Sequence, residues 1–110
     1  AVALYNTAEL ISAAKHRRKS LTPRREVRTG TGTRTIALSP DGSLLFAVVN
    51  FASELAVLDA ETLTILFTVP ADSYPVGLAV SPDGQQVWVT SQGRDLRGGN
   101  SVMVYRVTRG

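Results

Sequence analysis

The chain has 110 residues, a length sufficient for one domain with a modest core, and its net charge is +3. It contains no cysteine, and this excludes disulfides, thiolate catalysis and cysteine-based metal sites. No apolar run reaches the roughly 20 residues that span a bilayer, and residues 1–14 lack the basic start and continuous apolar core of a signal peptide.

The first third of the chain has two possible interpretations. Taken alone, residues 7–19 fit a short helix capped by Thr7. However, residues 4–13 align with residues 57–66, where Asp-Ala-Glu-Thr between apolar runs is typical of a tight turn between strands. We therefore predict two strands around Asn6, followed by a long, polar and basic loop over residues 14–33.

The central feature of the chain is a repeated hairpin pattern over residues 32–50 and 74–92. In each copy a short apolar run meets Ser-Pro-Asp-Gly, and a second apolar run follows. Proline presets φ, aspartate hydrogen-bonds its own backbone, and glycine accepts a positive φ, so the tetrapeptide predicts a hairpin turn. The two turns begin 42 residues apart, which is typical of the four-stranded blades of a β-propeller.

The rest of the chain supplies the outer strands. Strands are expected at residues 54–58 and 63–69, with a turn at Asp59, and a last strand at residues 101–107 follows the glycine-rich connection 93–99. The strands of a blade are labelled a to d from the centre of the propeller outward. In chain order, the predicted strands are c and d of one blade, a, b, c and d of the next, and a, b and c of a third. The fold class predicted is all-β, with propeller blades of four antiparallel strands, about two and a quarter blades in all. The predicted divisions are 1–33 (outer strands of one blade plus the basic loop), 34–70 (a complete blade) and 74–107 (three strands of the next blade).

This strand count leaves blade faces and edges uncovered, and such surfaces tend to associate. We therefore expect the chain to be a fragment of a larger propeller or one member of an assembly, with other propeller blades as its partners.

The segments PVGLAVSPDGQQVWVTSQ and ELAVLDAETLTILFTV closely resemble the YVTN family of β-propeller repeats. The likeness is close over residues 54–107, good over 34–50 and faint before that; one departure is Thr33, which stands where Pro75 stands in the other copy. The resemblance implies a bacterial or archaeal propeller, commonly exported to the periplasm or cell surface, that acts as a binding scaffold without assigned catalysis. The stretch VWVTSQGRDLRGGNSVMVYRV also resembles lactonase-type propellers that hydrolyse sugar lactones, although no catalytic residue can be carried over from them.

Basic residues concentrate in two predicted insertions, residues 14–33 and 91–100. Strand alternation is expected to bring both insertions to one rim, where arginines would pair with an acidic partner or anionic ligand. A solvated insertion without a ligand competes with this hypothesis, and the loop lacks the interleaved aromatics that favour nucleic acid. Tyr74, at the entry to an innermost strand, could line the mouth of the central channel. The candidate ligand-binding residues are Arg17, Arg18, Arg24, Arg25, Arg34, Tyr74, Arg94 and Arg97.

Other candidates are better explained by structure. His16 has no second ligand at metal-binding spacing, and Gly30-Thr31-Gly32 lacks the third glycine of a dinucleotide fingerprint, so no metal and no cofactor is predicted. Asp41, Asp59 and Asp83 fit as turn residues, and no hydrolase triad is visible. Phe46 and Trp88 lie at equivalent places inside apolar strands and are both expected in the core.

The leading hypothesis is therefore a non-enzymatic propeller module that presents loops to a protein, glycan or other anionic ligand. Two alternatives stay open. One is part of a lactonase-like hydrolase, whose catalytic groups would lie partly in other blades, and the other is a structural surface-layer module.

Overall fold

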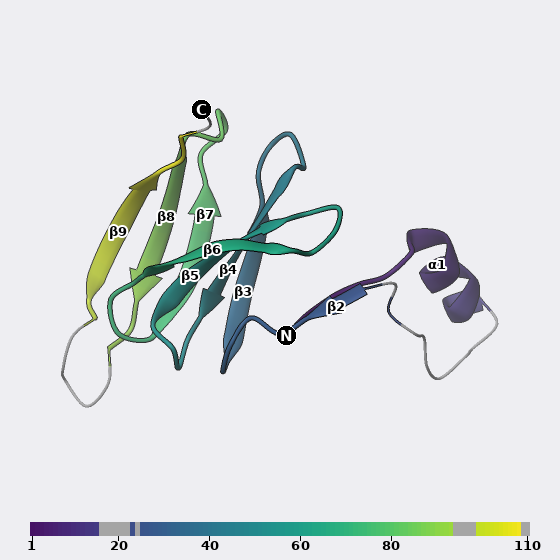
Figure 1. Cartoon of the computed structure of the whole chain (residues 1–110), viewed down its shortest axis with the longest axis horizontal. Helices are drawn as coiled ribbons and strands as arrows, with labels where there is room; N and C mark the ends of the chain where they lie inside the picture. Colours follow the sequence, from purple (N-terminus) through teal and green to yellow (C-terminus); the bar gives the residue numbers. More distant parts are fainter. Residues whose placement is uncertain (16–22, 24, 94–98, 109–110) are drawn as a thin grey trace.

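The computed structural model describes residues 1–15, 23, 25–93 and 99–108 and shows three antiparallel sheets. Figure 1 shows two blades side by side, with a two-stranded ribbon and one helix, α1 (Thr7–Lys15), extending away from them. The ribbon is β1 (Val2–Leu4) and β2 (Arg25–Val27); the first blade is β3 (Thr33–Leu38), β4 (Leu44–Val49), β5 (Glu54–Asp59) and β6 (Ile65–Pro70); the second is β7 (Pro75–Val80), β8 (Gln86–Ser91) and β9 (Ser101–Arg106). Apart from α1, the predicted fold of partial β-propeller blades is confirmed.

Both Ser-Pro-Asp-Gly turns form as the residues predict. In the first turn the Asp41 carboxylate accepts hydrogen bonds from the Ser39 hydroxyl at 2.7 Å and from the Ser43 N–H at 3.0 Å. In the second, Asp83 accepts from the Ser81 hydroxyl at 2.6 Å and from the Gln85 N–H at 2.9 Å. The glycines have φ of 75° and 73°, a conformation that other residues rarely adopt, so both tetrapeptides close tight hairpins.

The core lies in two layers, one on each face of the first blade. Alternation along β4 sends Leu45, Ala47 and Val49 toward Val2 of the ribbon. The opposite face of β4 carries Phe46, which is 1% exposed and packs between the blades against Val87 of the second blade. The expectation that Phe46 belongs to the core is confirmed.

The matching expectation for Trp88 is wrong for this chain. Trp88 is equivalent to Phe46, yet it is 45% exposed because it lies on the outer face of the second blade, where the described chain places no further blade. Val104 lies directly opposite Trp88 on β9 and is 50% exposed on the same face. The repeat places Trp88 on the same face of its strand as Phe46. Whether that face is buried depends on a neighbouring blade, which the strand sequence does not specify.

The predicted strand pair around Asn6 is only half right. β1 is the strand expected, but the residues after Asn6 form helix α1, and the partner of β1 is β2. The register pairs Val2 with Val27, as Leu55 pairs with Val69 in the first blade, so β1 and β2 take the c and d positions. The physical reason is composition: residues 7–15 contain three alanines, which favour helix, whereas the aligned residues 60–68 contain one alanine and three threonines, and threonine favours strand.

This assignment changes where the basic insertion emerges. We call the end of the blades that carries residues 28–32, 50–53, 71–74, 92–93 and 99–100 the connection rim, which lies at the bottom of Figure 1, and the opposite end the turn rim. The c-to-d turn of the first blade belongs to the turn rim, since the Ala60 N–H donates to the Ser43 carbonyl at 3.0 Å beside the first Ser-Pro-Asp-Gly turn.

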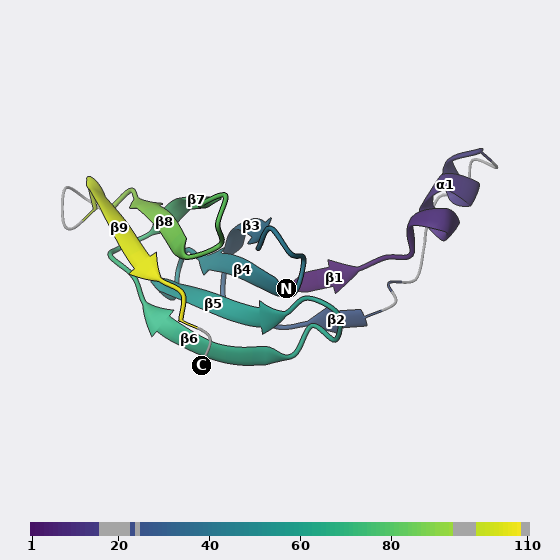
Figure 2. The same ribbon diagram turned by 90° about the horizontal axis from the view of Figure 1, so that it is seen from above.

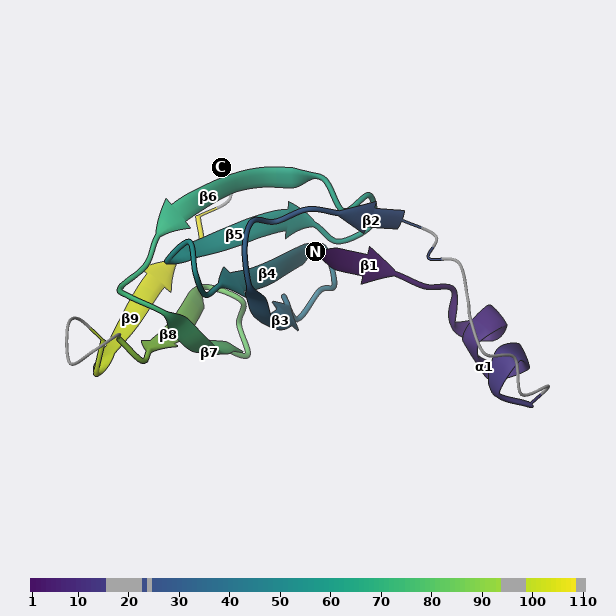
Figure 3. The ribbon, with the colours of Figure 1, turned by 90° about the horizontal axis from the view of Figure 1, so that it is seen from below.

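Residues 5–15 follow strand c of the ribbon, so they leave on the turn-rim side, and Figures 2 and 3 show α1 beyond the end of β1. Residues 92–93 and 99–100, which flank the second insertion between b and c, lie on the connection rim. The described ends of the two insertions therefore lie on different rims, contrary to the prediction, because α1 follows strand c inside a blade and does not link two blades.

Candidate functional site

The connection rim is held by the same main-chain hydrogen bonds in both blades. In the first blade the Asn50 N–H donates to the Gly32 carbonyl at 2.8 Å, and in the second the Gln92 N–H donates to the Tyr74 carbonyl at 2.9 Å. Because each pair joins the b-to-c connection to the entry of strand a, the inner part of the rim is rigid in each blade.

Two further contacts join the blades at this rim. The buried side-chain amide of Asn50 donates to the Pro75 carbonyl at 3.0 Å, and the Tyr74 N–H donates to the Ser53 hydroxyl at 3.4 Å. Buried polar groups that are fully paired fix one arrangement of the surrounding backbone. The rim is thus a preorganised surface shared by both blades.

An aromatic pair stands on this surface. The rings of Phe51 and Tyr74 meet edge to face, with centroids 6.0 Å apart and planes at 82°. Phe51 is 62% exposed, and Tyr74 has a φ of 55°, a left-handed conformation that is uncommon for a residue other than glycine. Gly32 lies beneath the Phe51 ring, since a Cβ at this position would come within 2.7 Å of it.

The sequence predicted Tyr74 but not Phe51. Tyr74 stands at the entry to β7, as expected from its place before Pro75. Phe51 occupies a loop position at which the second copy has Gly93, so the repeat gave no signal for an aromatic residue there. The only available signal was a large apolar side chain placed outside any apolar strand.

Asp72 anchors the longer connection of the second blade. Its carboxylate accepts hydrogen bonds from the Ser101 hydroxyl at 2.6 Å, the Ser73 N–H at 2.7 Å and the Gly99 N–H at 3.1 Å. These bonds, led by that of Ser101, stabilise the charged form and lower the pKa of Asp72 below its ordinary value of 3.8. The Ser91 hydroxyl also donates to the Asp72 carbonyl at 3.2 Å, so this one residue fixes both ends of the connection. No pattern in the sequence marked Asp72 as a functional residue.

The predicted arginines separate into three groups. Arg34 is exposed at the start of β3, where the register shifts between Thr33 and Thr35, and so it lies next to the connection rim. Arg25 is exposed on β2, in the ribbon and away from Tyr74. The other predicted residues, Arg17, Arg18, Arg24, Arg94 and Arg97, lie outside the residues that the structure describes.

The turn aspartates have the structural role expected of them. The pKa of Asp59 is lowered by hydrogen bonds that its carboxylate accepts, first from the Thr62 N–H, and the pKa of Asp83 is lowered first by the Ser81 hydroxyl. Over residues 1–15, 23, 25–93 and 99–108, no three His, Cys, Asp or Glu side chains come together as metal ligands. In the same part of the chain, no helix has the length and apolar character needed to cross a membrane.

Two stacked antiparallel meanders, one of four strands and one of three, with their innermost strands side by side, define the class: this chain is part of a β-propeller. The family described as lactonase, 7-bladed β-propeller, matches residues 6–110. The chain therefore belongs to this family, and as a partial propeller it is completed by other blades.

Three solved structures share the fold, while no curated protein matches the chain. Hydrazine synthase from Kuenenia stuttgartiensis superposes with a TM-score of 0.62 at 29% identity, covering 80% of this chain and 24% of that one. A functionally unknown protein from Desulfotomaculum acetoxidans gives a TM-score of 0.65 at 22% identity, covering 81% and 27%. A structure described as the eukaryotic initiation factor gives 0.62 at 20% identity, covering 96% and 24%. The chain thus spans about a quarter of each of these proteins.

Proposed function

We propose that this chain is a non-enzymatic binding module of a larger propeller, of the YVTN type, and that its ligand meets the connection rim. The observation that carries the proposal is the exposed Phe51 ring, held edge-on against Tyr74 on a rim that hydrogen bonds make rigid. An apolar ring left in water on a preorganised surface is a common mark of a binding site. The exported, cell-surface location that YVTN repeats imply belongs to the same proposal.

The ligand we infer is an anionic glycan. Phe51 offers a flat apolar surface for the face of a sugar ring, and Arg34 offers a guanidinium for a sulfate or carboxylate at the same rim. Arg94 and Arg97 belong to the connection 92–100 and would add charge to this rim. Residues 5–15, which begin the insertion between β1 and β2, leave the blades toward the turn rim and take no part in this site.

The described carboxylates support a binding role over a catalytic one. Asp41, Asp59, Asp72 and Asp83 each accept two or more hydrogen bonds from their own turn or connection. A carboxylate engaged in this way is poorly placed to take a proton from a substrate near neutral pH, and the pKa values of Asp59, Asp72 and Asp83 are lowered by these hydrogen bonds.

Heparin oligosaccharides of defined length are a suitable probe, with binding measured by isothermal titration calorimetry at physiological salt. We expect Phe51→Ser and Arg34→Gln each to weaken binding about tenfold, which is the loss of one stacked ring or one charge-assisted hydrogen bond. Arg25→Gln removes an equally exposed charge from the ribbon and is the matched control, expected to change the affinity by less than twofold. Equal affinities in all four proteins would overturn the proposal, and so would binding to an acidic peptide alone.

The family match favours one alternative, in which the completed propeller hydrolyses a lactone. Hydrolysis of a sugar lactone by the complete propeller, lost when a residue at the connection rim of these two blades is replaced, would replace the binding proposal with this one.

A further inference from the structure

Met103 on β9 is the single methionine of the chain, and its sulfur lies beside the connection rim. The sulfur accepts a hydrogen bond from the Asp72 N–H at 3.0 Å. The Tyr105 hydroxyl, which donates to the Pro70 carbonyl at 2.8 Å, lies 3.5 Å from the same sulfur. A thioether is a weak acceptor, so its lone pairs stay reactive toward an oxidant while these contacts fix its position. Met103 therefore joins β9 to Asp72, the residue that anchors the second connection.

Asp72 and Ser73 hold both described ends of this connection. The Asp72 carboxylate accepts hydrogen bonds from the Gly99 N–H and the Ser101 hydroxyl. The Ser73 carbonyl accepts one from the Gly93 N–H at 2.9 Å. Gly93 and Gly99 lie so close together that a Cβ on Gly99 would collide with the Gly93 main chain. A shift of the main chain at residues 72–73 would therefore reach both ends of the connection at once.

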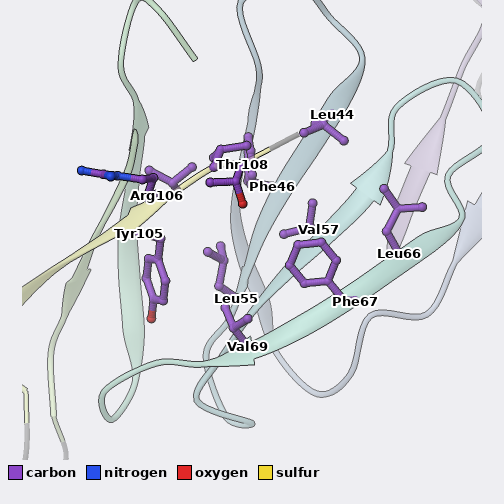
Figure 4. Close-up of a pocket in the computed structure, with 12 residues that line it drawn as sticks. Leu44, Phe46, Leu55, Val57, Leu66, Phe67, Val69, Tyr105, Arg106 and Thr108 are labelled. Atoms are coloured by element: carbon purple, nitrogen blue, oxygen red, sulfur yellow. The ribbon is translucent and has the colours of Figure 1, made fainter. Parts of the chain in front are cut away.

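Tyr105 limits the space on another side of the sulfur. An apolar cleft of about 440 Å³ lies between the outer strands of the two blades, and Figure 4 shows Tyr105 of β9 on one side of it and Val69 of β6 on the other. Met103 precedes Tyr105 by two residues and so lies on the same face of β9. The Tyr105 hydroxyl cannot move away from the sulfur without losing its hydrogen bond to the Pro70 carbonyl. Met103 itself is half-buried, which leaves a path for a molecule as small as hydrogen peroxide.

We propose that Met103 is a modification site, at which a peroxide oxidises the thioether to a sulfoxide and thereby releases Asp72. With hydrogen peroxide, a sulfur lone pair attacks one oxygen, the S–O bond forms, the O–O bond breaks, and the second oxygen leaves as water with both hydrogens. The sulfur gives up two electrons and the peroxide is reduced. In the reverse step, catalysed by a methionine sulfoxide reductase, two thiols supply two electrons and become a disulfide, and the sulfoxide oxygen leaves as water. The proposal does not depend on the ligand at the connection rim.

The oxygen added to the sulfur does not fit the contacts of the reduced side chain. On the side of Asp72 it would occupy the 3.0 Å between the sulfur and the main-chain nitrogen, and on the side of Tyr105 it would meet a hydroxyl that Pro70 holds in place. Oxidation also makes the side chain polar and chiral, which changes its packing. The main chain at Asp72 has to move, and the hydrogen bonds that its carboxylate accepts from Gly99 and Ser101 are weakened. Oxidation of one side chain thus loosens both ends of the connection.

The test treats the full chain with hydrogen peroxide and identifies the sulfoxide by mass spectrometry, which is straightforward because the chain has one methionine and no cysteine. We expect Met103 in the folded chain to be oxidised within about tenfold of its rate in the urea-unfolded chain. Amide hydrogen exchange followed by NMR then reports on the connection: the Gly93 and Gly99 N–H groups should exchange at least about tenfold faster after oxidation. The Gly42 N–H, which donates to the Ser39 carbonyl on the turn rim, is the matched control and should be unchanged. Treatment with methionine sulfoxide reductases and a dithiol should restore the original exchange rates.

Two variants separate Met103 from any other effect of the peroxide. Met103→Leu keeps a side chain of similar size without the sulfur, so peroxide should leave its Gly99 exchange rate unchanged. Met103→Gln places a polar side chain of similar length at the same position and should give fast Gly99 exchange without an oxidant. Resistance of Met103 to peroxide in the folded chain, or equal Gly99 exchange in the reduced and oxidised chains, would overturn the proposal. An equal acceleration at Gly42 would also overturn it, since that result means general unfolding and not release of Asp72.

Discussion

Replacement of the two equivalent aromatic residues, Phe46 and Trp88, should have unequal effects on stability. Phe46 is 1% exposed and packed on every side between the blades, so Phe46→Ala loses the transfer free energy of the ring and leaves a cavity. Such substitutions lower the free energy of unfolding by about 3–5 kcal/mol. Trp88 is 45% exposed on an open face, so its removal forms no closed cavity.

For Trp88→Ala only the covered part of the ring counts. Full burial of a large apolar side chain stabilises a protein by about 1.5–3 kcal/mol, and a little over half of Trp88 is covered, so we expect a loss of about 1–2 kcal/mol. Unfolding in urea followed by circular dichroism is the assay, because Trp88 is the only tryptophan and a fluorescence signal would be lost with it.

The unequal effects of Phe46→Ala and Trp88→Ala depend on the absence of a further blade over Trp88 in the described residues. If both variants lose the same free energy of unfolding, Trp88 is covered in solution, by self-association or by a different packing, and the exposed outer face described above is wrong. In a completed propeller the next blade should bury Trp88, and the cost of Trp88→Ala should then rise into the range expected for Phe46→Ala.

Three further predictions concern the connection rim and the cleft. Gly32→Ala should lower the free energy of unfolding by about 1–3 kcal/mol in a urea titration, since φ is 81° and the new Cβ would meet the Phe51 ring; an unchanged midpoint would show that the rim is not rigid. The folded-state pKa of Asp72 is below 3.8, so the stabilising effect of its carboxylate should be complete well above pH 3.8 and should be lost as the pH falls through 3.8 toward the lowered folded-state pKa. Asp72→Asn should therefore be less stable than the wild type at pH 7, and the two proteins should approach equal stability below pH 3.8. A difference in the free energy of unfolding that stays constant with pH would contradict this. Burial, followed by the negative charge of Asp72, raises the pKa of Tyr105 above 10.0, so the ultraviolet difference spectrum between wild type and Tyr105→Phe should show a phenol that ionises above pH 10, and ionisation at or below pH 10 would contradict the burial of its ring beside the cleft.

Local chemistry made the hairpins predictable. Ser39 to Gly42 and Ser81 to Gly84 form their turns with the hydrogen bonds of their own side chains, and the alternation of β4 directs Phe46 to one face wherever the strand packs. The spacing between the two turns then identified the blades, because turn, strand and repeat length all favoured the same architecture. The match of residues 4–13 to residues 57–66 predicted a strand before Asn6, where β1 lies, but the second strand that it predicted is helix α1.

Tertiary structure decided which strands pair and which side chains are buried, because both depend on segments that are distant in sequence. Helix α1 and strand β2 could not be placed from the repeat alone, since the partner of β1 lies beyond an insertion that the other blade lacks. Phe46 and Trp88 have the same sequence context but opposite exposure, because burial is a property of what packs on a face and only one of the two faces has a neighbour in this chain. For the same reason Phe51, Asp72 and the Met103 site came from the structure: each is formed by segments distant in sequence, and no pattern within one segment specifies such a contact.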